Sequence, residues 1–303
     1  MDTYFDLGGY SFPVTTQSTE AQTWFDRGIL WTYGYNHEEA VTCFERAIEA
    51  DPKCAMAHWG AGYASGPNYN MPWDLFDDAG RAAAARAGYT HARKALDLID
   101  GVTGWEAALI HALPTRYPKP DPLDPEAMKA WNAGFADAMR DAFDVHPESH
   151  EVRTVFAESL LNLTPWKMWD LPSGQPAAGA RTIEAQTVLE EALEGDPSAM
   201  HHPGLLHLYV HLMEMSPSPE KALKAGDALR RLVPDAGHLV HMPTHIDILC
   251  GHYQNVVDWN EAAIKADLKF YKERGAFNIY TGYRQHNYHF VIYGAMFLGQ
   301  FEP

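Results

Sequence analysis

The sequence predicts an all-α fold built from repeated pairs of helices. Three observations favour this class. Residues 21–54 place small and aromatic side chains at helical spacing, the same frame recurs along the chain, and prolines stand where second helices of the repeats should end. A period of this size indicates stacked helical hairpins, each of which buries its apolar face against the next.

The clearest unit runs from Ala21 to Cys54. The markers of its two helices are small and aromatic residues followed by a proline: Trp24, Gly28, Trp31, Ala40, Phe44, Ala47 and Pro52. Small residues let helices approach closely, aromatic rings fill the remaining gaps, and the proline stops the second helix. This unit resembles the tetratricopeptide repeat (TPR), a helix-turn-helix of about 34 residues. It departs from the family pattern at Arg27, where leucine is usual.

The resemblance covers most of the chain and is weakest across 95–200. It implies one TPR-like α-α superhelical solenoid with irregular insertions, spanning residues 1–303. We expect units near 21–54, 55–100, 116–149, 150–196, 203–236, 237–270 and 285–303. The last unit stops at Pro303, before its second helix. This indicates a truncation or a helix supplied by a partner, and an exposed apolar face could pair two copies in a homodimer.

Two proline-rich loops interrupt the predicted helices, at Leu113–Pro125 and Leu163–Pro176. Long irregular loops in a compact fold are often functional. The segments Pro67–Trp73 and Pro165–Asp170 carry aromatics and amides that could line a substrate pocket, although plain loop packing explains them equally well.

The bulk composition restricts the partners and the compartment. The formal net charge of −17 repels phosphate backbones and anionic lipid, so we expect no nucleic-acid and no membrane partner. Three cysteines give no disulfide framework, and the N-terminus lacks a secretory signal. The longest apolar runs fall short of the roughly 20 residues that a spanning helix needs. We therefore expect a cytoplasmic protein.

Histidines recur at positions that, in TPR proteins, line the concave groove where ligands bind. The pairs His207/His211 and His241/His245 lie one repeat of 34 residues apart. Counted in the same frame, the groove positions hold His207, His211, His238, His241, His245, His286 and His289, with Glu158, Asn162 and Glu214. Pro243 suits the first turn of a helix, so His238 and His241 could belong to a loop before it.

This pattern predicts a metal site. Two histidines four residues apart lie on one helix face, and two such pairs on neighbouring helices can converge on one point. Neutral imidazole is the commonest metal ligand and suits copper, iron and zinc. We favour copper or iron and keep zinc open. Glu158 and Glu214 are the predicted acid–base groups, further ligands or partners of the ligands.

The predicted function is a metal-dependent oxidoreductase that acts on a small organic substrate in the groove. Asn162, Tyr283 and Arg284 are the candidate substrate-binding residues. Three alternatives stay open: a zinc-type hydrolase or lyase in the same groove, a TPR adaptor that holds a peptide or protein partner without metal, and a structural seam of histidines that responds to pH. The sequence carries no P-loop and no dinucleotide-binding fingerprint.

Overall fold

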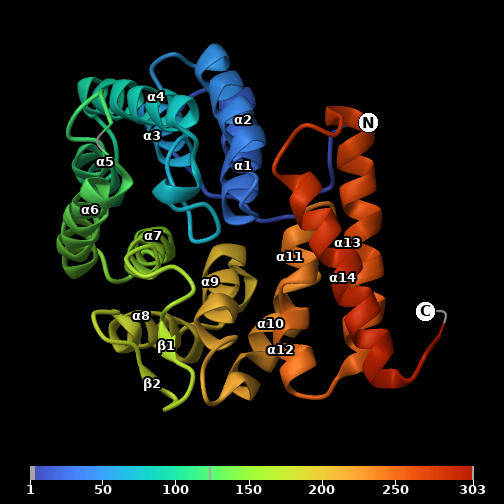
Figure 1. Cartoon of the computed structure of the whole chain (residues 1–303). Helices are drawn as coiled ribbons and strands as arrows, with labels where there is room; N and C mark the ends of the chain where they lie inside the picture. The colour runs from blue at the N-terminus through green and yellow to red at the C-terminus, as the bar shows by residue number, and fades with distance from the viewer. Residues whose placement is uncertain (1–3, 123, 302–303) are drawn as a thin grey trace. The chain divides into compact units, whose positions relative to one another are not determined.

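The chain is mostly helical, which confirms the all-α part of the predicted fold class, while the TPR-like solenoid stays a prediction. The structure, a computed structural model, describes residues 4–122 and 124–301 (Figure 1). Among these residues the strands are β1 (Trp169–Asp170) and β2 (Gln175–Pro176), which pair in a two-stranded sheet. The described helices are either too short or too polar to traverse a lipid bilayer.

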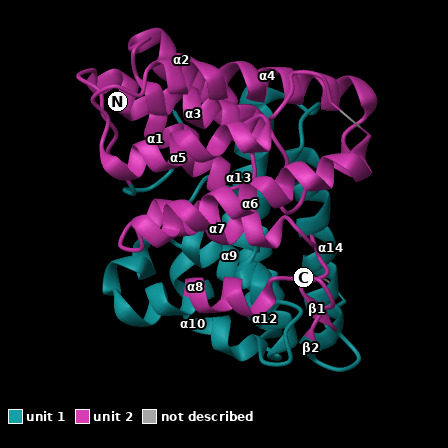
Figure 2. Cartoon of the chain, turned by 90° about the vertical axis from the view of Figure 1, so that its left-hand side faces the viewer, with its two compact units in different colours: residues 1–10, 171–175, 190–303 teal, residues 11–170, 176–189 magenta. Residues whose placement is uncertain are grey.

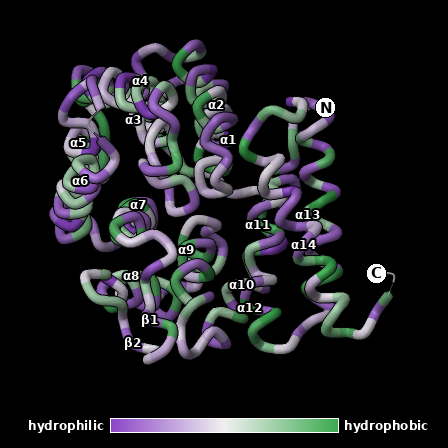
Figure 3. Tube along the Cα trace, viewed as in Figure 1, coloured by the Kyte–Doolittle hydropathy of each residue, from purple (hydrophilic) through white to green (hydrophobic). Residues whose placement is uncertain are grey.

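The contacts divide the chain into two compact units, coloured separately in Figure 2. Unit 1 comprises residues 1–10, 171–175 and 190–303, and unit 2 comprises residues 11–170 and 176–189. In both units the helices combine hydrophobic and hydrophilic residues along their length, as Figure 3 shows. The single domain predicted for residues 1–303 stays a prediction.

Consecutive helices of unit 2 pack as pairs: α1 with α2, α3 with α4, and α5 with α6. The helices are α1 (Thr19–Tyr33), α2 (His37–Ala50), α3 (Ala55–Ala64), α4 (Asp78–Asp97), α5 (Gly104–Arg116), α6 (Pro125–Val145), α7 (His150–Leu161) and the first part of α8 (Thr182–Gly195), with the 3-10 turn η1 (Trp73–Leu75). The first two pairs correspond to the predicted units 21–54 and 55–100, except that α1 begins two residues earlier, at Thr19.

The first pair forms for the reasons that the sequence suggested. Ser18 and Asn36 cap the two helices by accepting hydrogen bonds from backbone N–H groups of the first turns. The fully buried ring of Phe44 fills the space above Gly28 and Gly60, where an added Cβ would lie 2.6 and 2.4 Å from a ring carbon. Glycine therefore lets α1 and α3 close onto the same phenylalanine.

The two predicted loops differ in extent from the structure. α5 continues to Arg116 with Pro114 inside its last turn, because Leu113 and Arg116 are buried and hold that turn in place. The first loop therefore begins at Tyr117. In the second predicted loop, Leu163–Pro176, the strands β1 and β2 replace part of the expected irregular segment.

Unit 1 carries most of the histidines on helices. Its elements are the rest of α8, η2 (Pro197–His201), α9 (Pro203–Met213), η3 (Pro219–Ala222), α10 (Leu223–Leu229), α11 (Gly237–His241), α12 (Pro243–Leu249), α13 (Tyr253–Arg274) and α14 (Tyr280–Leu298). His238 and His241 thus lie in a helix and not in a loop. α14 begins earlier than the predicted Gln285, because buried Tyr280 packs its ring against Phe270 of α13.

Candidate metal centre

Six of the seven predicted metal ligands gather in two groups of three within unit 1. We call His207, His211 and His238 site A, and His241, His245 and His286 site B. In each group one ring nitrogen per residue lies within 4.8 Å of the others. His289 lies on α14 outside both groups. The sequence predicted convergence on one point, whereas the structure separates the histidines into two.

Local structure explains why α9 and α11 carry these rings. Pro203 opens α9 at its first turn, where the missing N–H costs nothing, and His202 Nδ1 accepts the hydrogen bond of Leu205 N–H. At the start of α11, a Cβ on residue 237 would lie 2.0 Å from Asp267 Oδ1. Gly237 therefore allows α11 to approach α13 closely enough to bring His238 to its place.

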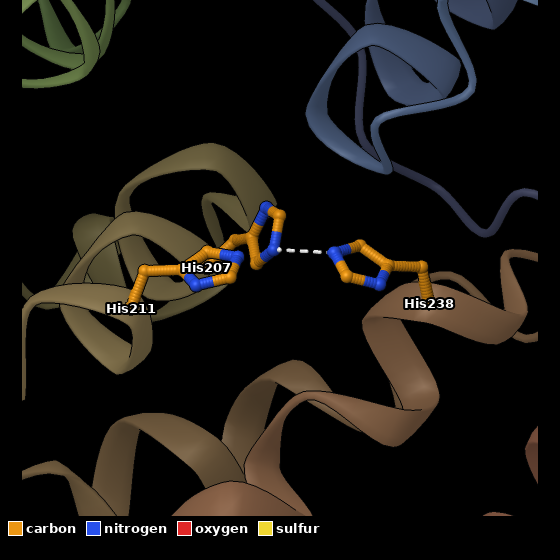
Figure 4. A group of neighbouring side chains, drawn as sticks. All are labelled: His207, His211 and His238. Atoms are coloured by element: carbon orange, nitrogen blue, oxygen red, sulfur yellow. Dashed lines mark hydrogen bonds between the residues drawn. The ribbon is translucent and has the colours of Figure 1, made fainter. Parts of the chain in front are cut away.

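Site A is closed on all sides. His207 and His211 stand one turn apart on α9, and their rings point toward that of His238 on α11 (Figure 4). Nε2 of His207 and Nε2 of His238 are 3.1 Å apart. The three side chains are 1–3% exposed. Tyr283 stacks on His238 with ring centroids 4.3 Å apart.

Site B reaches the surface. Nε2 of His245 lies 2.9 Å from Nε2 of His241 and 3.4 Å from Nε2 of His286. The ring of Phe290 packs against all three imidazoles at centroid distances of 4.5–4.8 Å. His241 is buried, the side chain of His245 is 22% exposed, and His286 is exposed on α14.

Asn260 fixes the ring of His241. Its Nδ2 group donates to Thr244 Oγ1 at 3.0 Å and to the Val256 carbonyl at 2.7 Å, which sets the orientation of the amide. Oδ1 must then accept from His241 Nδ1, 2.6 Å away. A neutral His241 therefore carries its proton on Nδ1 and turns an unprotonated Nε2 toward site B.

Glu214 joins the two sites. Oε1 accepts from His211 Nδ1 at 2.8 Å, and Oε2 accepts from His245 Nδ1 at 2.6 Å. The side chain is 8% exposed. A carboxylate on one ring nitrogen fixes the tautomer and raises the basicity of the other, an arrangement common around metal-binding histidines. One carboxylate does this here for a histidine of each site.

The surroundings favour neutral rings at His238, His241 and His286 and an ionised carboxylate at Glu214. Burial, and then the neighbouring imidazoles, lower the pKa of His238 and His241 well below the usual value. The same causes lower the pKa of His286 to about 4. Burial alone would raise the pKa of Glu214, but the charge of His245 and the hydrogen bonds from His211 and His245 outweigh it and hold that pKa well below its usual range. Unprotonated nitrogens are the form that binds metal.

The remaining predicted residues have other surroundings. Glu158, in unit 2, is buried and accepts a hydrogen bond from the Tyr63 hydroxyl. Arg284 lies over the ring of Tyr271, with its guanidinium carbon 4.8 Å from the ring centroid. Tyr283, a predicted substrate-binding residue, lies against the site A ring of His238.

Asn162 ends α7 and borders a pocket of unit 2 of about 290 Å³. Trp73 and Trp166 border the same pocket. The two loop segments expected to line a pocket, Pro67–Trp73 and Pro165–Asp170, therefore each contribute a tryptophan to one hollow.

Sequence reasoning missed Asn260 and Phe290. Both contact histidines from other helices, at separations of 19 and 45–49 residues along the chain. Their roles depend on tertiary packing, and neither stands in a motif. No model of a known protein family and no curated protein sequence matches this chain.

Proposed function

We propose that the chain is a metal-dependent enzyme whose histidine groups bind transition-metal ions. One observation carries this proposal: His241 and His245 turn their Nε2 atoms toward each other at 2.9 Å. Each ring already donates from Nδ1, His241 to Asn260 and His245 to Glu214. In neutral rings both Nε2 atoms then present lone pairs to each other, and such a pair needs a cation between its members.

That cation is either a proton or a metal ion. Burial and neighbouring imidazoles depress the pKa of His241, which disfavours a proton on that ring. A metal ion also accounts for the third nitrogen, because His286 Nε2 lies 3.4 Å from His245 Nε2. Ligands about 2.05 Å from a tetrahedral ion stand about 3.3 Å apart. One separation in site A, between His207 and His238, and two in site B, from His245 to His241 and to His286, are 2.9–3.4 Å and so are close to that value. Within each site the three nitrogens all lie within 4.8 Å of one another.

The chemistry that we propose is oxidoreduction by copper or iron on a small organic substrate. Ligation by nitrogen alone suits copper and iron, and three protein ligands leave coordination positions open. Zinc fits the same spacing and would support hydrolysis, which is the alternative. Both oxygens of Glu214 are occupied by histidines, so we assign Glu214 the role of a positioning residue and not that of a base.

The proposal includes the predicted scaffold and compartment. The helix pairs of unit 2 and the match of α1 and α2 to the unit 21–54 support a TPR-like solenoid. The three cysteines, Cys43, Cys54 and Cys250, form no disulfide in the described structure, which fits a reducing cytoplasm.

Metal analysis tests the proposal directly. Protein purified without added metal is measured by mass spectrometry for copper, iron and zinc, and then for oxygen uptake with catechols and ascorbate as reducing substrates. We expect bound copper or iron and uptake that His245→Ala abolishes. His289→Ala, on α14 but outside both sites, is the matched control and should retain metal. A protein that binds none of these metals, even when they are supplied, would disprove the proposal.

A further inference from the structure

We propose that the centre holds two metal ions of unequal role: copper in site B binds small external ligands such as dioxygen, and copper in the closed site A supplies the second electron. This inference rests on the proposed function and deepens it. It follows from the separation of the sites, their unequal exposure and their shared partner.

The ring nitrogens of the six histidines form two separate groups of three. His238 and His241 belong to one short helix, yet each turns to a different group, and their ring centroids are 6.3 Å apart. A metal ion lies about 3.2 Å from the centroid of an imidazole that binds it. Two ions held by these rings would therefore stand within about 13 Å of each other, on either side of one helical turn.

Only site B is open to external ligands. The site A histidines are 1–3% exposed, and Tyr283 covers the ring of His238. In site B, by contrast, His286 is exposed and borders a shallow hollow on α14 of about 370 Å³, which His289, Phe290 and Tyr293 also line. A small molecule that enters this hollow meets a site B ligand directly.

The shared partner suits a pair of ions that act together. One oxygen of Glu214 accepts a hydrogen bond from His211 and the other accepts one from His245. A single negative charge therefore raises the basicity of one histidine ligand of each ion. Each copper changes by one electron. Two reduced ions supply two electrons, which with two protons convert dioxygen to hydrogen peroxide. An organic substrate that loses two hydrogen atoms returns two electrons and two protons, which closes the cycle.

Copper stoichiometry tests the number of sites. Metal-free full-length protein is loaded with copper(II), freed of excess and analysed. We expect two ions per chain in the wild type and in the control His289→Ala. We expect one ion in His286→Ala, which removes an exposed ligand with little risk to folding, and one in His207→Gln, which keeps most of the side-chain volume in the core.

Azide tests the division of roles. Azide bound to copper(II) produces a charge-transfer absorption, which we expect in the wild type and in His207→Gln, where only site B is filled. It should be absent from His286→Ala, where only site A is filled. A hydrophilic chelator should likewise remove the ion of site B first and that of site A many-fold more slowly.

The outcomes separate the two proposals. A wild type that binds no copper overturns the proposed function as well as this inference. A single ion per chain leaves the metal-dependent enzyme intact and overturns the pair. Two ions that both take azide, or that leave at one rate, overturn the unequal roles alone.

Discussion

Nε2 of His241 and Nε2 of His245 lie 2.9 Å apart while Asn260 and Glu214 accept the Nδ1 protons of the same two rings. The hydrogen bonds on the outer side of each ring direct the lone pairs of the inner side toward a common point. The surroundings of the histidines therefore support the proposed metal site more specifically than the histidines themselves, since a pair of rings without such partners could turn away or share a proton.

Metal should stabilise the folded chain. A ligand that binds only the folded state at a free concentration about 1,000 times its Kd adds about 4 kcal/mol to the free energy of unfolding. We expect copper(II) to raise the midpoint of thermal unfolding, and a chelator to reverse the rise. His245→Ala should show a clearly smaller increase than His289→Ala. Equal increases in the two variants would mean that copper binds elsewhere.

Glu214→Gln should weaken both sites. Glutamine keeps the volume but has a single oxygen to accept from His211 and His245, and it removes the negative charge. Losing such a partner typically costs 10–100-fold in metal affinity. Competition titration with a chromophoric chelator would give both dissociation constants, and Glu214→Asp, which keeps the charge, should recover part of the loss. An unchanged affinity at both sites would rule out the shared role.

Asn260→Ala should weaken site B alone, by the same 10–100-fold range, because Asn260 contacts His241 and no site A histidine in its described hydrogen bonds. The variant also loses buried hydrogen bonds, so we expect a stability loss of about 1–3 kcal/mol. Copper titration followed by azide absorption reports site B, while total copper reports both. A parallel weakening of the two sites would indicate general loosening of the fold.

The sequence predicted which histidines lie close together better than how they divide into groups. Helical periodicity is a local property, so the frame placed His207 and His211 on one face of α9. The assignment of His238 to site A and His241 to site B could not be predicted, because it depends on α11 ending at His241 and on the approach of α13 and α14. His289 follows His286 by three residues and satisfies the same pattern, yet it lies outside site B.

The fold, too, could be predicted from the sequence only where local residue patterns determine it. The small and aromatic markers of residues 21–54 predicted α1 and α2, because close packing needs those residue types at that spacing. Proline was a less reliable guide to the ends of helices. Pro114 lies within the last turn of α5, where burial of Leu113 and Arg116 overrides the intrinsic preference of proline.

Asp267 should make unit 1 less stable as the pH rises. Burial raises the pKa of this carboxyl to about 8, against partial compensation by Arg284 and by the hydrogen bond from Asn287; Tyr280 also lies near. Because the folded-state pKa exceeds the unfolded value, the folded state holds the proton more tightly. The contribution to stability is complete below about pH 4 and is lost as the pH rises to about 8.

Asp267→Asn isolates this effect, because the amide does not titrate. Urea unfolding at several pH values gives the free energy of unfolding of both proteins. Between pH 4 and 8 that of the wild type should fall by up to roughly 1.4 kcal/mol per pH unit relative to the variant. Above pH 8 the difference between the two proteins should stay constant. The difference between the two proteins removes the contribution of the histidines, which titrate in both. Parallel stability curves would mean that Asp267 is ionised throughout.

Gly60→Ala should destabilise unit 2 although alanine is the better helix former. The added methyl would lie 2.4 Å from Cε1 of Phe44. Because the Phe44 side chain is fully buried, its ring cannot move toward solvent to relieve the clash. Overpacking of this kind costs about 1–3 kcal/mol, which exceeds the gain of up to about 1 kcal/mol from helix propensity. Gly195→Ala, where an added Cβ meets no described atom within 4 Å, is the control and should be neutral or stabilising.

A double-mutant cycle tests whether the clash with Phe44 is the cause. If it is, Phe44→Leu should lower the free energy of unfolding less in the Gly60→Ala background than in the wild type, and urea unfolding of the wild type, the two single variants and the double variant gives that coupling. Equal costs of Phe44→Leu in both backgrounds would show that α3 tolerates the methyl and that close packing does not require glycine there.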